Sequence, residues 1–348
     1  EYIVYSWEGL FGEGLGDPSI ADPLAYANAT LFDAAGGIDP GYNLFNVSSV
    51  ADLIDPDTRT VRPGVTRRYT PEKFADFSFQ AAIRTEGNIR MSGGDDKTSY
   101  FVTAGFLDDN GYALNTGFER YNTRLNLTSQ IKDWLKVSSS INYAYSENQN
   151  NGQTVGSENL FEFADKNPPI FPVFLRDNDF NLVPDPIFGG FQYDFGSPSG
   201  FRSRNNANLL NPVASAVYDF LGSERHDIIG NFSAEVQLAE GLVFETRFGL
   251  QFANDIQKNY NNPFYGTAVQ QGGTLFQREQ QDVTTNFLQL LRYNKSFGSH
   301  SFDALIAHES NDYTRDRSSG SKRDVAIPGL LELDNFAVAQ GQPTGFSE

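Results

Sequence analysis

Histidine is the side chain best suited to acid–base chemistry near neutral pH, and this sequence of 348 residues contains three of them. His226, His300 and His308 are dispersed, and none belongs to a His-Glu-x-x-His motif. The sequence also lacks a Gly-x-Ser-x-Gly elbow, a Walker loop and any cysteine. Carboxylates are so plentiful in this acidic chain that no pair of them is singled out for catalysis. We therefore predict a protein that is not an enzyme and that carries no organic cofactor.

One short segment has the residue types of a calcium loop. Residues 177–181 read Asp-Asn-Asp-Phe-Asn, which supplies oxygen ligands at the first positions of such a loop. Leu182 stands where an EF-hand requires Gly, and Phe188 stands where it requires Glu, so an EF-hand is excluded. Turn formation is the main alternative, because Asp and Asn side chains bond to nearby backbone groups in turns. A looser, loop-bound calcium site stays open, and its candidate ligands are Asp177, Asp179 and Asn181.

Composition gives the first indication of the class of protein and of the structural elements that would position a site. The formal net charge of −18 and the absence of a basic stripe argue against nucleic-acid binding. No run of about 18 apolar residues occurs, so no transmembrane helix is predicted. The sequence opens without Met or a basic leader and ends abruptly, and we expect it to be a fragment of a longer protein.

From about Phe77 onward, apolar and polar side chains alternate with a period of two. This pattern is typical of β-strands that present one apolar and one polar face. Pairs of such runs flank short turns and predict three hairpins. We expect these hairpins at about 121–146, 228–252 and 277–316, with turns near 132, 240 and 298.

Two features favour a membrane barrel over a soluble sandwich or solenoid, which remains the alternative from the pattern alone. The predicted strands run about 12 to 18 residues, whereas strands in globular proteins usually have about 5 to 6. Short turns alternate with long connections at about 147–222 and 257–276, as in outer-membrane barrels. We predict an all-β, antiparallel barrel segment of about eight strands over residues 77–348. Residues 1–76 are expected to form a strand end followed by a long irregular loop.

A specific series of motifs lies between Asn88 and about Asn148. A strand ending in Ser92-Gly93-Gly94 is followed by a charged turn and a strand that opens at Tyr100. An Arg120-Tyr121 pair, a strand with Arg124-Leu125-Asn126 and the turn Asp133-Trp134-Leu135 come next. In this order, the series resembles the barrel of SusC/RagA-type TonB-dependent transporters of the Bacteroidetes. Weaker similarity extends to Asn211-Pro212-Val213-Ala214 and to the hairpin at 291–300.

The resemblance implies a nutrient importer of the bacterial outer membrane. Members of this family have a plug inside a 22-stranded barrel, a segment that contacts TonB, and a SusD-like surface lipoprotein that acts as a lid. Their ligands are oligosaccharides or peptides. The plug, the TonB-contacting segment and the C-terminal strands are expected to lie outside this chain. Two alternatives remain: a secreted or surface β-sheet protein that binds glycans, and a passive porin.

The connection at about 147–222 is the predicted contact region for ligand or lid. It is unusually long and rich in aromatic residues, which disordered linkers lack. Its rings have three possible uses: packing within the loop, contact with the lid protein, or stacking on sugars. The candidate contact residues are Phe188, Phe191, Tyr193 and Phe195, among further aromatic residues that include Phe161, Phe163, Phe171, Phe174 and Phe201.

Two further groups of residues are predicted from the barrel geometry. The lumen is expected to receive Arg124, Glu235, Glu245 and Arg247. Aromatic residues near strand ends are expected to lie at the membrane boundary, because amphipathic rings favour that zone. These are Trp134, Tyr143, Tyr145, Tyr293 and Phe297.

Overall fold

The computed structural model describes residues 1–150, 159–196, 204 and 210–347. These residues form two compact units. The loop unit comprises residues 1–80, 151–219 and 261–270, and the sheet unit comprises residues 81–150, 220–260 and 271–348. Phe201, one of the predicted loop aromatics, lies outside the described residues.

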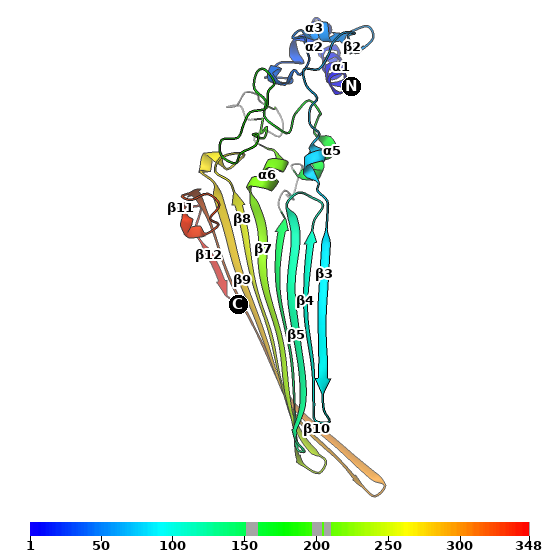
Figure 1. The fold of residues 1–348 in the computed structure, drawn as a ribbon, viewed down its shortest axis with the longest axis vertical. Coiled ribbons are helices and arrows are strands. Elements are labelled where there is room, and N and C mark those ends of the chain that lie inside the picture. The colour runs from blue at the N-terminus through cyan, green and yellow to red at the C-terminus, as the bar shows by residue number, and fades with distance from the viewer. Residues whose placement is uncertain (151–158, 197–203, 205–209, 348) are drawn as a thin grey trace. The chain divides into compact units, whose positions relative to one another are not determined.

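The sheet unit is one antiparallel sheet with eight long strands, which confirms the predicted fold class. Figure 1 shows these strands lying side by side in chain order. Short β11 (Phe336–Ala339) and β12 (Thr344–Ser347) pair with the last long strand. The edge strands do not pair with one another, so the sheet is open. The long strands are β3 (Arg84–Gly94), β4 (Thr98–Asn110), β5 (Thr116–Lys132), β6 (Leu135–Asn150), β7 (Phe220–Ala239), β8 (Leu242–Asn261), β9 (Thr274–Phe297) and β10 (His300–Val325).

Short turns join β3–β4, β5–β6, β7–β8 and β9–β10, all at the same end of the sheet (Figure 1). Gly241 and Gly298 have φ values of +77° and +63° in two of these turns, a region that favours glycine. The connections at the opposite end include the two long ones that the sequence predicted. All three predicted hairpins are therefore present, with strands longer than expected.

The register places apolar side chains of neighbouring strands on one common face. Leu125 pairs with Val102 and Ile141, and Phe232 pairs with Phe248. Nothing among the described residues covers this face: Ile89 is 76% exposed, and large exposed apolar side chains continue across the sheet. A soluble protein rarely exposes so large a contiguous apolar surface.

The loop unit begins with a helix where we had expected a strand end, so that expectation is wrong. Residues Tyr2–Gly16 form α1, whose buried residues Ile3, Trp7 and Gly14 recur at helical spacing. Asp22 caps the next helix by accepting hydrogen bonds from the backbone N–H groups of Leu24 and Ala25. The core of this unit packs α1 against residues from Ala27 to Ile54 and against Ile170 and Phe171.

The remaining elements of the structure are short. No helix of the described ranges is long and apolar enough to span a membrane. In the loop unit they are α2 (Pro23–Thr30), η1 (Pro40–Tyr42), α3 (Val50–Leu53), β1 (Ile54–Asp55), β2 (Thr60–Val61), α4 (Phe74–Ser78), α5 (Leu160–Lys166) and α6 (Pro212–Tyr218). Two further 3₁₀ turns are η2 (Val269–Gln271) and η3 (Leu333–Asn335).

Candidate functional site

A buried carboxylate organises the long β6–β7 connection of the loop unit. Asp185 is 6% exposed and accepts hydrogen bonds from the backbone N–H groups of Ile187 (2.8 Å) and Phe188 (3.1 Å). The hydroxyls of Tyr218 and Tyr265 each donate to it at 2.9 Å. These four bonds join residue 185 to the end of α6 and to the β8–β9 connection, and they satisfy both carboxylate oxygens.

The electrostatics of this cluster keep the carboxylate ionised and the tyrosines neutral. Burial alone would raise the pKa of Asp185, but the two backbone bonds and the two tyrosine hydroxyls outweigh it, so the pKa is lowered. Burial, followed by the bond to Asp185, raises the pKa of Tyr265 to about 12. The same causes raise the pKa of Tyr218 strongly. The cluster therefore acts as a fixed anchor over the ordinary pH range.

The structure brings all four predicted contact residues into one aromatic cluster around this anchor. Phe188 stacks on Tyr218 with ring centroids 4.1 Å apart, and Phe195 stacks on Tyr265 at 5.9 Å. Tyr193 contacts Tyr218 edge-on at 5.5 Å. Phe191 joins through Phe174, which also contacts Tyr193. Much of the aromatic content thus packs the loop internally, the first of the three uses considered.

The four residues differ in accessibility. Phe195 is buried and Tyr193 is half-buried, whereas Phe188 and Phe191 are 47% and 45% exposed. Between the two exposed rings, Gly189 and Gly190 have φ values of +79° and +69°, and open space surrounds the position of any added Cβ. Residues 187–191 therefore form an exposed apolar tip on a fixed base, called the aromatic tip below.

Sequence reasoning missed Asp185, Tyr218 and Tyr265. Their contacts span 33 and 80 residues, so no local motif unites them. The local signal for Asp185 was the segment Asp185-Pro186, which precedes the apolar pair Ile187-Phe188. It indicates a turn, because Asp favours the first position of a turn and Pro favours the second.

The calcium-loop candidate uses its oxygens in a turn. The Asp177 carboxylate accepts hydrogen bonds from the backbone N–H groups of Asp179 and Asn181, both at 2.9 Å. Phe180 between them has a φ of +66°. No group of three or more His, Asp or Glu side chains suited to a metal ion occurs among the described residues. The turn interpretation therefore accounts for the geometry of these residues.

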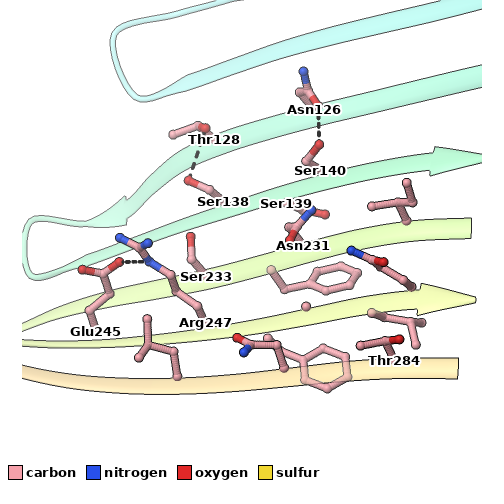
Figure 2. Close-up of a pocket in the computed structure, with 18 of the residues that line it drawn as sticks. Asn126, Thr128, Ser138, Ser139, Ser140, Asn231, Ser233, Glu245, Arg247 and Thr284 are labelled. Atoms are coloured by element: carbon pink, nitrogen blue, oxygen red, sulfur yellow. Dashed lines mark hydrogen bonds and ion pairs between the residues drawn. The ribbon is translucent and has the colours of Figure 1, made fainter. Parts of the chain in front are cut away.

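The polar face of the sheet carries a second candidate region, a hollow of about 810 Å³. Figure 2 shows hydroxyl and amide side chains of β5, β6 and β7 facing into it. Ser140 donates to Asn126 at 2.7 Å, and Thr128 donates to Ser138 at 3.3 Å. Uncharged hydrogen-bonding residues are therefore the largest class in the lining, beside apolar residues that include Ile229 and Leu288.

Charged residues lie at one side of this hollow. Glu245 is 5% exposed and accepts hydrogen bonds from Arg247 and Arg292. Arg292 also forms an ion pair with Glu235 at 3.8 Å. The four residues predicted to face the lumen thus share the polar face. Arg124 lines the hollow, whereas Glu235, Glu245 and Arg247 form one ion-pair cluster with Arg292.

The aromatic residues predicted for the membrane boundary lie at two levels of the sheet. Trp134 and Phe297 are 53% and 55% exposed at the short turns. Towards the opposite end, Tyr145 pairs with Tyr121, and its ring lies 5.0 Å from the His226 ring. Tyr143 hydrogen-bonds with Nδ1 of His226 at 2.9 Å. Tyr293 lies on β9 near the β9–β10 turn.

Comparisons with known proteins find TonB-dependent receptors among the relatives of this chain. No protein-family model matches the chain. The TonB-dependent receptor SusC of Bacteroides thetaiotaomicron is 23% identical over 69% of this chain and 24% of the receptor. The TonB-dependent receptor P3 of Formosa agariphila is 25% identical over 77% of this chain and 26% of the receptor. The chain thus spans about a quarter of the length of these relatives.

Solved structures show the same fold. A structure of the RagAB peptide transporter matches with a TM-score of 0.60 and 22% identity, covering 80% of this chain and 30% of the transporter chain. The RagAB peptide importer in its 'open-open' state also gives a TM-score of 0.60, at 23% identity. The predicted resemblance and the predicted location in the outer membrane are confirmed. The chain is a β-barrel segment similar to those of SusC- and RagA-like TonB-dependent receptors, which are outer-membrane proteins.

Proposed function

We propose that this chain forms part of the barrel wall of an outer-membrane importer that takes up oligosaccharides or peptides with energy supplied through TonB. The observation that carries the proposal is the two-faced sheet. Its uncovered apolar face suits lipid, and its polar face, with the hollow of Figure 2, suits a hydrated lumen. The similarity to TonB-dependent receptors supports energised uptake over passive diffusion. In this proposal the protein is not an enzyme.

The proposal includes the parts that complete such an importer. The rest of the barrel, the plug and the TonB-contacting segment belong to the parent protein outside this chain. A SusD-like surface lipoprotein is the proposed lid. The two aromatic levels of the sheet are the proposed lipid boundaries, because amphipathic rings favour the zone between hydrocarbon and water.

We assign the aromatic tip to contact with the lid or the ligand. Phe188 and Phe191 expose nearly half of their surface although Asp185 and Tyr218 fix their surroundings. A rigid, exposed aromatic pair loses little conformational entropy on binding, which suits it to a protein contact or to stacking on a sugar ring. Either use requires a tip that is held in place before its partner arrives.

The first experiment measures whether the full-length receptor is a closed membrane barrel that imports. Outer membranes are extracted with detergent, and the receptor is run on SDS gels with and without boiling. We expect a band that shifts on heating, and ligand uptake that stops when the proton-motive force is collapsed. Uptake that persists without energy would instead indicate a porin, and a soluble protein with an unshifted band would contradict the membrane assignment.

A second experiment tests the aromatic tip. The double variant Phe188→Ala/Phe191→Ala should assemble normally, because the anchoring bonds to Asp185 come from backbone and from tyrosines. It should lose co-purification with the lid, or lose ligand uptake, by at least tenfold. Val269→Ala is the matched control, because Val269 is 43% exposed in the other long connection. Unchanged lid binding and unchanged uptake would refute the assignment.

A further inference from the structure

A cleft of about 310 Å³ lies within the loop unit, at one side of α1. Its walls are partly apolar and partly polar, and they come from the helix, from the segment after α2 and from the β6–β7 connection. One cationic side chain, Arg204, and one carboxylate, Asp39, also line it. The apolar wall residues are Leu10, Leu31, Ile38 and Phe171.

Arg204 is buried with part of its guanidinium unpaired. It is 2% exposed, and its Nη2 donates to the backbone carbonyls of Asp194 (3.1 Å) and Leu210. Among the residues that the structure describes, its Nε and Nη1 have no hydrogen-bond partner. Within the described part of the chain, the ion pairs of the loop unit are formed by Arg59, Arg62, Lys166 and Arg176 and do not include Arg204.

Two carboxylates lie near this group, and both accept hydrogen bonds from other residues. The Oδ1 atom of Asp194 accepts hydrogen bonds from the Tyr42 hydroxyl at 3.1 Å and from the backbone N–H of Gly196 at 2.7 Å. Asp39 accepts from the backbone N–H of Gly41 at 2.7 Å. A buried cation without a bonded anion is costly, so an anionic group that reached Arg204 would be strongly favoured.

We propose that this cleft binds the carboxylate of a small ligand with an apolar body. The planar guanidinium presents its donors in the geometry that a carboxylate accepts. The apolar part of the walls would hold an aliphatic or aromatic group, and the volume suits a small molecule. A free organic acid and the C-terminal carboxylate of a short peptide both have this chemistry. The proposal goes beyond the proposed importer function and does not depend on transport.

The backbone at Gly196 holds Arg204 against the cleft. Gly196 has a φ of +58°, and a Cβ added there would collide with the Arg204 side chain. Its carbonyl also accepts a hydrogen bond from the Arg204 backbone N–H at 3.2 Å. Gly196→Ala should therefore displace the guanidinium without removing its charge.

The test uses the purified full-length receptor in detergent and ¹⁹F NMR of 4-fluorophenylacetate. We expect saturable line broadening by the wild type and none with 2-(4-fluorophenyl)ethanol, which lacks the carboxylate. Arg204→Gln should weaken binding at least tenfold, whereas Arg59→Gln should leave it unchanged. Arg59 is the matched control because it lies in the same unit but is exposed and paired with Glu8.

Two further variants keep the test decisive if Arg204→Gln fails to fold. Arg204→Lys should retain part of the binding because it keeps the charge, and Gly196→Ala should lose it. Competition by glycyl-phenylalanine, but not by its C-terminal amide, would identify a peptide terminus as the preferred source. Competition only by free organic acids would identify a free organic acid as the preferred ligand. Equal broadening of the alcohol, or full binding by Gly196→Ala and Arg204→Gln, would overturn the proposal.

Discussion

Asp185 connects three separate parts of the loop unit through one side chain. Its two oxygens are shared between two backbone N–H groups and two tyrosine hydroxyls. Since its pKa is lowered in the folded protein, the stability that it contributes is present above about pH 4, the ordinary value for Asp. That contribution is lost as the pH falls through the lower, folded pKa.

Asp185→Asn should loosen the aromatic tip. An amide has one carbonyl acceptor, so at least one of the tyrosine or backbone donors loses its partner, at a cost of about 2 kcal/mol. Hydrogen exchange of a peptide that contains residues 187 and 188 should accelerate at least about tenfold. Asp179→Asn is the control, because Asp179 is exposed on the same connection. Equal hydrogen-exchange rates of this peptide in the two variants would contradict the anchoring role of Asp185.

Tyr265 should ionise unusually late. Its pKa in the folded protein is about 12, against an ordinary value near 10, so its hydroxyl stabilises the fold fully below pH 10. This contribution is lost as the pH rises from about 10 to about 12. The difference in absorbance at 295 nm between wild type and Tyr265→Phe should titrate near pH 12. A midpoint near pH 10 would show that the hydroxyl is not held by Asp185.

At the scale of the element, glycine and aromatic residues are paired across neighbouring strands. Gly87 on β3 lies opposite Phe106 on β4, and a Cβ added to Gly87 would collide with the Phe106 ring. Gly93 lies opposite Tyr100 in the same way. The rings cover the backbone of the edge strand at these glycines, so the two strands pack closely.

Gly87→Val should therefore impair assembly of this strand pair. Forcing a branched side chain under the Phe106 ring is expected to cost about 1–3 kcal/mol. The heat-modifiable fraction of the receptor should decrease, and Phe106→Ala should restore it by removing the ring. Gly117→Ala is the control, because its Cβ would have no neighbour closer than 3.7 Å. A normal heat-modifiable fraction for Gly87→Val would show that the pairing is looser than the structure has it.

At the scale of the whole molecule, the two faces of the sheet meet different surroundings. Leu125 lies on the apolar face and is 41% exposed, whereas the adjacent Asn126 lies on the polar face and lines the hollow. Leu125→Lys should impair membrane assembly, because a Lys facing lipid near the bilayer midplane costs about 2–4 kcal/mol. Asn126→Lys carries the same charge to the hydrated face and should assemble normally. Equal assembly of both variants, measured by heat modifiability, would contradict the assignment of faces.

The sheet could be predicted from the sequence because its signals are local. Alternation at residues 121–128 fixes which side chains share a face, and short turns at 132, 240 and 298 fix which strands are neighbours. The motif series from Asn88 to Asn148 added the resemblance that the comparisons confirm. The start of the chain was missed because the β-branched Ile3 and Val4 obscured the helical spacing of Ile3, Trp7 and Gly14.

The sequence by itself therefore determined the two-faced barrel segment, because the alternation of a strand depends only on consecutive residues. The tertiary structure alone decided which distant residues meet at the candidate sites. Asp185 meets Tyr265 across 80 residues, and Arg204 lines a cleft with residues of α1 almost 200 positions earlier. Such contacts depend on the way in which the long connections fold back on one another. A local sequence pattern does not predict which buried charge or ring will contact which partner.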